Sequence, residues 1–211
     1  TEKKIYYIYQ NYLDKLDDFP LDSIGIDSNE VFTKLFVTKV DMNANNGLGK
    51  VVYKRKLVYD DQNFYQNTFV KHANGRDWWS ILNHVNGKDY LVLEWKNDSL
   101  LSRRKFTFPD SSSQPYKNFS QGMGQKCFSR DGSLFIDLRA TNEIRIFNFD
   151  RCNGIMSYNR RIEFIDNPNW IGQSLGVEIS PNNRFLYLAY RDTLTQYDME
   201  ASDFVKSRVI L

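Results

Sequence analysis

The chain has 211 residues, and 28 Lys and Arg residues against 26 Asp and Glu residues leave a net charge of +2 at pH 7. That surplus is too small to favour nucleic acid as a partner, and no apolar stretch approaches the roughly 18 residues that a membrane-spanning helix needs. The two cysteines, Cys127 and Cys152, are too few for a disulfide framework and lack metal-ligand spacing. We therefore expect two free thiols, no metal and no cofactor.

A motif that occurs twice gives the first indication of the fold. Residues 127–136 read CFSRDGSLFI and residues 177–187 read VEISPNNRFLY, and each is followed by an apolar run that ends in an aromatic residue and Asp. Weaker echoes occur twice nearer the amino terminus, and successive repeat ends lie 54, 55 and 48 residues apart. The repeat ends are Asp41, Trp95, Asp150 and Asp198. A period near 50 residues made of short strands is typical of β-propeller blades.

The first two repeats are the more diverged. In the first, residues 35–42 and 51–59 are predicted to form the last two strands of a blade, and residues 5–9 form a strand whose place in the blade is not fixed. In the second, Gly75 occupies the turn position, since Gly adopts positive φ at little cost. The predicted strands of this repeat are residues 78–82, 90–95 and 104–108.

The third and fourth repeats share one order of strands around a tight turn, Asp131-Gly132 in the third and residues 181–183 in the fourth. Their predicted strands are residues 125–129, 134–138, 144–149 and 159–164, then 176–179, 185–190, 193–197 and 205–211. No segment shows a sustained period of 3.6, so we expect almost no helix. The sequence thus predicts an all-β protein, a single β-propeller segment of about four visible blades of four-stranded antiparallel sheets. The approximate blades are residues 1–59, 60–108, 109–164 and 165–211.

Several of these motifs resemble one known family. The turn-and-strand pattern at residues 128–136, the run FDRCNG at 149–154 and the run SPNNRFLYLAYRDTLTQYDME at 180–200 are similar to the WD40-like or YVTN-like propellers of large secreted proteins exported by the type IX, gliding-associated secretion system. Residues 75–79 and 40–49 also match, so the resemblance covers roughly residues 35–211. It implies a secreted or cell-surface location and a larger propeller of which this chain is part, with further blades or a partner chain covering its ends.

Candidate catalytic motifs lack their structural context. Residues 172–176 read GQSLG and match the nucleophile elbow G-x-S-x-G, but the elbow needs a helix after the Ser. The following residues predict a strand and a turn, which favours a Gly-flanked loop. Only His72 and His84 could serve as a catalytic base, and surface or loop positions are the simpler interpretation of both.

Basic residues recur with the period of the repeat on the predicted outermost strands. Two interpretations are open: a basic rim that binds polyanions, or charges that prevent edge-to-edge pairing of exposed strands. The clusters are residues 54–56, 103–105 and 160–161, and Lys206 with Arg208.

The geometry of a blade predicts where a ligand would bind. The loop between the second and third strands and the connection to the next blade emerge on the same face, and aromatic and Arg side chains there suit sugars or extended peptides. The alternative is that the aromatic residues only fix long loops against the rim. The candidate binding residues are Trp170, Tyr116, Arg139, Tyr190 and Arg191.

Three functions follow from this reading. The first is a non-enzymatic scaffold or binding propeller of a secreted or cell-surface protein, with a protein or glycan partner on the loop face. The second is an enzyme of the lactonase or quinoprotein type. The third is a cytoplasmic protein-interaction propeller, which the missing Gly-His and Trp-Asp signature disfavours. We take the first as our hypothesis, because a propeller hosts many functions and no catalytic motif here has its context.

Overall fold

A computed structural model of the chain describes residues 4–13, 33–60, 64–84, 86–109, 124–139, 143–163, 174–190 and 193–211. Fifteen β-strands lie within these residues, paired into four antiparallel sheets. The helical segments among them are two 3-10 turns, Asn45–Gly47 and Val205–Ser207. The predicted all-β class, with four consecutive sheets and almost no helix, is therefore confirmed.

Three sheets have four strands each, in sequence order from one edge to the other. The second sheet of the chain comprises β4 (Phe64–Lys71), β5 (Trp78–His84), β6 (Asp89–Lys96) and β7 (Ser99–Thr107). The third comprises β8 (Lys126–Phe128), β9 (Leu134–Arg139), β10 (Glu143–Asp150) and β11 (Ile155–Glu163). The fourth comprises β12 (Ser174–Ile179), β13 (Phe185–Tyr190), β14 (Thr193–Asp198) and β15 (Val209–Ile210).

The first sheet has three strands within the described residues: β1 (Ile5–Leu13), β2 (Thr33–Asp41) and β3 (Lys50–Asp60), in that order. β3 leads to the next sheet as β7 and β11 do, so it holds the outermost position and β1 the second. The strand that the sequence could not place is thus the second strand of its blade. The expectation of four strands is not met here, since no described residue supplies the innermost strand.

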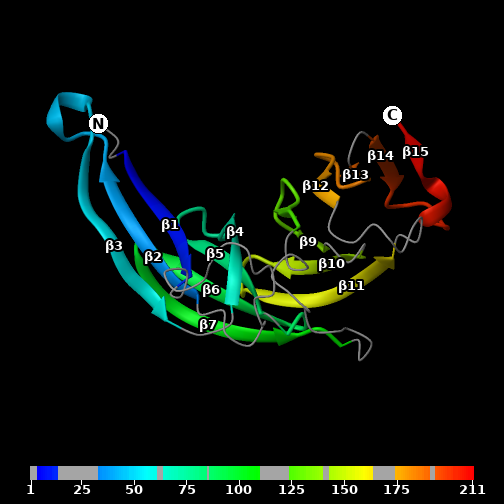
Figure 1. Cartoon of the computed structure of the whole chain (residues 1–211), viewed down its shortest axis with the longest axis horizontal. Coiled ribbons are helices and arrows are strands. Elements are labelled where there is room, and N and C mark those ends of the chain that lie inside the picture. Colours follow the sequence, from blue (N-terminus) through cyan, green and yellow to red (C-terminus); the bar gives the residue numbers. More distant parts are fainter. Residues whose placement is uncertain are drawn as a thin grey trace, which may run out of the picture.

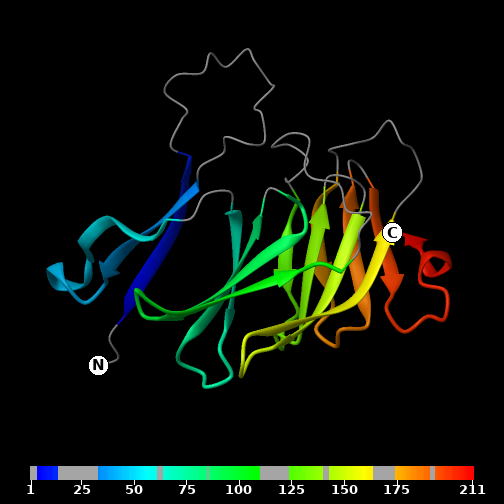
Figure 2. The ribbon, with the colours of Figure 1, turned by 90° about the horizontal axis from the view of Figure 1, so that it is seen from below.

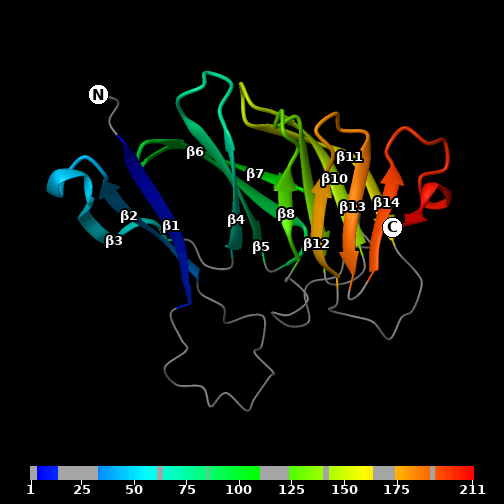
Figure 3. The ribbon, with the colours of Figure 1, turned by 90° about the horizontal axis from the view of Figure 1, so that it is seen from above.

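The four sheets follow one another along an open arc, with the two chain ends at its opposite ends (Figure 1). The described hairpin turns β4–β5, β10–β11 and β12–β13 lie on one side of this arc (Figure 2). Strands β5, β9 and β13 end on the other side, at His84, Arg139 and Tyr190 (Figure 3). We call these two sides the turn face and the loop face.

Apolar side chains fill the space between successive sheets. Because neighbouring residues of a strand point to opposite faces, Phe135 packs toward the second sheet while Ile136 packs toward the fourth. Leu35 and Trp95 join the first sheet to the second in the same way. The third sheet is therefore buried on both faces, and its central strands β9 and β10 carry buried side chains on each.

Candidate functional site: a charged seam between the second and third sheets

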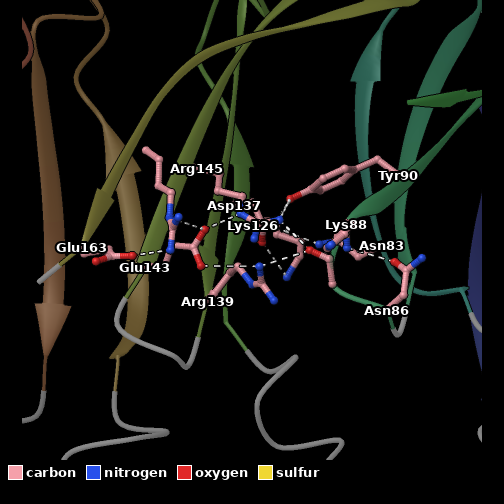
Figure 4. Close-up of polar contacts among 12 residues, drawn as sticks. Asn83, Asn86, Lys88, Tyr90, Lys126, Asp137, Arg139, Glu143, Arg145 and Glu163 are labelled. Carbon is pink, nitrogen blue, oxygen red and sulfur yellow. Dashed lines mark hydrogen bonds and ion pairs between the residues drawn. The ribbon is translucent and has the colours of Figure 1, made fainter. Parts of the chain in front are cut away.

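Charged side chains gather between the second and third sheets, close to the loop face (Figure 4). We call this group the charged seam. Its members are Lys126, Asp137, Arg139, Glu143, Arg145 and Arg161. Five of the six side chains are nearly or completely buried, and that of Arg161 is 20% exposed. Asp137 and Arg139 alternate with apolar residues along β9, as Glu143 and Arg145 do along β10, which places them on the face of the third sheet that also carries Phe135.

The strand register places opposite charges side by side. Asp137 is directly paired with Lys126 on one side and with Arg145 on the other. In the neighbouring row Glu143 is paired with Arg139. Opposite charges in such cross-strand positions stabilise a sheet, and like charges there destabilise it. The register of β8, β9 and β10 therefore places the charged residues of the seam next to one another.

Asp137 is completely buried and has partners on two sheets. Its Oδ1 lies 3.1 Å from Lys126 Nζ, and its Oδ2 accepts hydrogen bonds from Asn83 Nδ2 at 3.0 Å and from the Tyr90 hydroxyl at 2.7 Å. Burial works to raise the pKa of Asp137, but the charges of Lys126, Arg139 and Arg145 and the Tyr90 hydrogen bond outweigh it and hold the pKa below its usual range. The carboxylate is thus ionised at neutral pH, with its charge matched inside the protein.

Arg145 also connects the third sheet to the second, in this case as a hydrogen-bond donor. Its guanidinium pairs with Glu143, donates to the Gly87 carbonyl at 2.6 Å, and lies 3.9 Å from the centre of the Phe108 ring. Arg139 donates to the same Gly87 carbonyl at 3.1 Å. Two arginines of the third sheet thus hold one carbonyl of the second sheet. The planar guanidinium suits such a site, because it supplies several oriented donors and stacks on a ring.

Gly87 lies in a turn that the chain uses twice. Residues 72–77 read HANGRD and residues 84–89 read HVNGKD. The first copy lies directly before β5, and the second begins at the last residue of β5. In both copies the His Nδ1 accepts a hydrogen bond from the backbone N–H of the Asn, at 3.0 and 2.9 Å. In both copies the Asn side chain donates to the closing Asp and the Gly has positive φ, +71° and +69°.

The repeated turn assigns a role to both histidines. His72 and His84 each hold a turn in place, His72 also stacking on Trp79 at 5.2 Å between ring centres. Both histidines lie at turns, in agreement with the simpler interpretation of the sequence, but their hydrogen bonds within those turns were not predicted. The signal that would have identified them is the pattern H-x-N-G-[RK]-D, in which Asn and Asp favour turns through side-chain hydrogen bonds to the backbone.

Of the five predicted binding residues, the structure describes the side chain of Arg139 alone. That guanidinium is buried in the seam and paired with Glu143 at 3.5 Å. Tyr190 is the last residue of β13, and nothing is described of its side chain. Tyr116, Trp170 and Arg191 lie outside the described residues. The binding site on the loop face therefore stays a prediction, and Arg139 would support it from the seam.

The described nucleophile candidates have surroundings that do not suit catalysis. Ser174 begins strand β12, which leads through a turn to strand β13, so the helix that a nucleophile elbow needs is replaced by a strand. Burial and the charge of Glu178 raise the pKa of Cys127 to about 12, so its thiol stays protonated. Cys127 and Cys152 are both free. No group of three or more potential metal ligands occurs among the described residues, and none of their helices is long and apolar enough to cross a membrane.

Three of the four basic clusters lie on outermost strands as predicted, whereas Lys206 of the fourth lies in the 3-10 turn Val205–Ser207. Arg55 is on β3, Arg104 on β7 and Arg161 on β11, each the outermost strand of its sheet, and Arg208 precedes β15. Arg161 reaches inward from this position and lies 3.2 Å from Glu143. At least one repeat-phased arginine thus pairs with a carboxylate of its own blade.

The chain is similar in fold to several solved β-propeller structures. No family model matches the chain, and no curated protein does. Among solved structures, the chain is similar to a periplasmic gluconolactonase of Pseudomonas aeruginosa, with a TM-score of 0.58 and 15% identity over 84% of this chain and 49% of that one. A putative 6-phosphogluconolactonase of Bacteroides uniformis gives 0.54 and 12% over 88% and 54%. The Cps50 (Swd1) β-propeller domain of Myceliophteria thermophila gives 0.50 and 11% over 85% and 57%.

These similarities, together with the arc of antiparallel sheets, define the chain as an all-β protein with the β-propeller fold. The chain spans about half the length of the solved structures it resembles. Identities of 11–15% establish the architecture alone.

Proposed function

We propose that this chain is a non-enzymatic propeller module that binds a protein or glycan partner on its loop face. The observation that supports this most is the pairing inside the charged seam. Asp137 and Glu143 are matched within the third sheet by Lys126, Arg139 and Arg145 at short range. Asp137, Arg139 and Arg145 also form hydrogen bonds with the second sheet, so these charged groups join two blades. A catalytic acid or base would need a pKa shifted toward neutrality, whereas the pKa of Asp137 is lowered.

The seam also gives the loop face a rigid base. Arg139 and Glu143 are the residues at which β9 ends and β10 begins, and both are held to the second sheet or to each other. Loops that carry binding residues work best on such a fixed scaffold. On this proposal Trp170, Tyr116, Tyr190 and Arg191 contact the partner, and Arg139 positions the strands beneath them.

The test compares two tryptophan variants in a glycan array and a pull-down. Trp170→Ala should weaken binding by about 2 kcal/mol, roughly 30-fold, if Trp170 anchors the partner. Trp78→Ala is the matched control, because Trp78 is exposed at the start of β5, on the turn face. Equal binding by wild type and Trp170→Ala would remove the loop face as the site.

The competing candidate is a lactone-hydrolysing propeller, and two similar structures carry gluconolactonase names. Incubating the unmodified protein with gluconolactone and its 6-phosphate distinguishes the two. Our proposal expects the rate of buffer alone. Hydrolysis above that rate, lost in a loop-face variant, would replace the binding function with the enzymatic one.

We further propose that the protein is secreted or displayed at the cell surface, through the type IX route. The support is the resemblance of its repeat motifs to exported propellers. Protease treatment of intact cells tests the location, because a displayed protein is cleaved while an internal one is protected.

A further inference from the structure

The outer, convex side of the arc is formed by the last strand of each sheet, and two of these strands, β3 and β7, are strongly basic (Figure 1). β3 carries four basic residues and one acidic residue, and β7 carries three basic residues and no acidic one. The chain as a whole is nearly balanced, with 28 basic and 26 acidic residues. Positive charge is therefore concentrated on two outer strands. We call residues 54–56 and 103–105 the outer basic surface.

The six residues of this surface are accessible and belong to one continuous region. All six are exposed. β3 and β7 are in contact, and the turn between β6 and β7 also holds β3, because Asp98 accepts a hydrogen bond from the Tyr53 hydroxyl and pairs with Lys56 at 3.2 Å. A ligand that follows the outer side of the arc would therefore meet both clusters.

The basic clusters of the third and fourth sheets have partners within the protein. Arg160 donates to a backbone carbonyl that follows β14 at 3.1 Å, and Arg161 lies 3.2 Å from Glu143. Lys206 pairs with Asp203 at 2.8 Å. Contacts within the protein thus account for these side chains.

Two cations of the outer basic surface differ from them. Lys105 pairs with Asp89 at 2.6 Å, whereas neither Lys54 nor Arg103 forms an ion pair or a ring contact with any described residue. Protection of sheet edges would place charges on every outermost strand alike. It does not explain why cations without such partners gather on β3 and β7.

The shape and the remaining side chains of the surface favour a flexible polysaccharide over a nucleic acid. Single-stranded nucleic acids bind largely by stacking their bases on aromatic side chains, and no aromatic residue of β3 or β7 is exposed. Double-stranded DNA is a stiff rod, so it would touch a convex surface at few points (Figure 1). A flexible chain that carries anionic groups along its length can follow the curve.

We propose that the outer basic surface binds an anionic polysaccharide, with Lys54 and Arg103 pairing with its carboxylate or sulfate groups. Arg103 suits this role because its planar guanidinium can donate two parallel hydrogen bonds to such a group. The other basic residues of the surface add a positive field that attracts the chain. This is a second binding site, since it lies on the outer side of the arc and uses none of the candidate residues of the loop face.

Titration calorimetry at low salt tests the proposal with two charged probes, dextran sulfate and polygalacturonate, and with uncharged dextran as the blank. The double variant Lys54→Gln/Arg103→Gln should weaken binding of a charged probe by about tenfold or more, because each cation near an anionic surface adds to its attraction. Lys206→Gln/Arg208→Gln is the matched control and should bind as the wild type does, since it removes two positive charges from the fourth cluster. Circular dichroism should be unchanged in both, because the substituted residues are exposed.

Binding should weaken as the salt concentration is raised, because salt screens exposed charges. Preference for one charged probe identifies whether sulfate or carboxylate is the group that the surface binds. Trp170→Ala should bind the charged probes as the wild type does, which separates this site from the loop face. Failure of the wild type to bind either charged probe, equal losses in the two double variants, loss of binding in Trp170→Ala, or tighter binding of DNA at the same salt would each overturn the proposal.

Discussion

Asp131 lies in the turn between β8 and β9 and accepts hydrogen bonds from its own turn and from the next blade. The Ser129 hydroxyl donates to it at 2.7 Å, the Ser133 backbone N–H at 3.0 Å, and Asn183 Nδ2 of the fourth sheet at 3.0 Å. Partial burial works to raise its pKa, but these hydrogen bonds lower the pKa of Asp131 to about 2.

The lowered pKa predicts a loss of stability in acid. A depressed folded-state pKa contributes stability above the unfolded value of about 3.9, and that contribution disappears as pH falls through about 2. Urea unfolding of wild type and Asp131→Asn at several pH values measures it. The wild type should be the more stable at pH 6, and the difference should shrink between pH 4 and pH 2. A difference independent of pH would contradict the assignment.

Contacts between residues close in the sequence could be predicted, and contacts between distant residues could not. The Asp131-Gly132 turn could be predicted, because its hydrogen bonds are local. Arg139 was expected at a ligand-binding surface and is buried. The alternation with Phe135 indicates its face, but its partner Gly87 lies 52 residues away on another sheet, and no local pattern reveals such a contact.

At the scale of elements, a turn of the third sheet packs on a tryptophan of the second. Trp79 is buried on β5, and its indole N–H donates to the Arg151 carbonyl at 2.8 Å. Gly154 closes that turn with φ of +65°, and a Cβ added there would lie 2.5 Å from the Trp79 ring. Glycine is required at this position for both the backbone conformation and the contact.

Replacing this glycine should therefore cost more than replacing a similar one in open space. Gly75 has φ of +71° with nothing within 4 Å of an added Cβ. We expect Gly75→Ala to lower the free energy of unfolding by about 1–2 kcal/mol, and Gly154→Ala by a further 1–3 kcal/mol from overpacking. Denaturant unfolding compares the two. Equal losses would mean that the turn does not press on Trp79.

Strand prediction succeeded where the apolar run was continuous and failed where polar residues interrupted it. The second strand of the fourth repeat, β13, has the predicted bounds. The first strand of the second repeat, β4, had no predicted counterpart, because its sequence FYQNTFVK mixes polar and apolar residues. The predicted last strand over residues 205–211 is reduced to β15, since Val205–Ser207 forms a 3-10 turn in which the Ser207 hydroxyl donates to the Phe204 carbonyl.

At the scale of the whole molecule, the repeat period predicted both the sheets and their order. A period fixes which segments are equivalent, and equivalent segments in a propeller contact only their neighbours. It does not show which neighbours share polar contacts, so the charged seam could not be predicted. The seam joins the second and third sheets through hydrogen bonds between its charged groups and Asn83, Tyr90 and Gly87, as well as by apolar packing.

A double-mutant cycle on Tyr90 and Asp137 tests that central claim most directly, because the Tyr90 hydroxyl of the second sheet donates to Asp137 of the third. Tyr90→Phe, Asp137→Asn and the double variant are compared with wild type by urea unfolding. Removing one partner of this buried hydrogen bond leaves the other partner unsatisfied and should cost about 1–3 kcal/mol. The double variant should cost less than the sum of the two by about 1 kcal/mol or more. Losses that add to within about 0.5 kcal/mol, the behaviour of independent sites, would contradict the claim that this contact holds the two blades together.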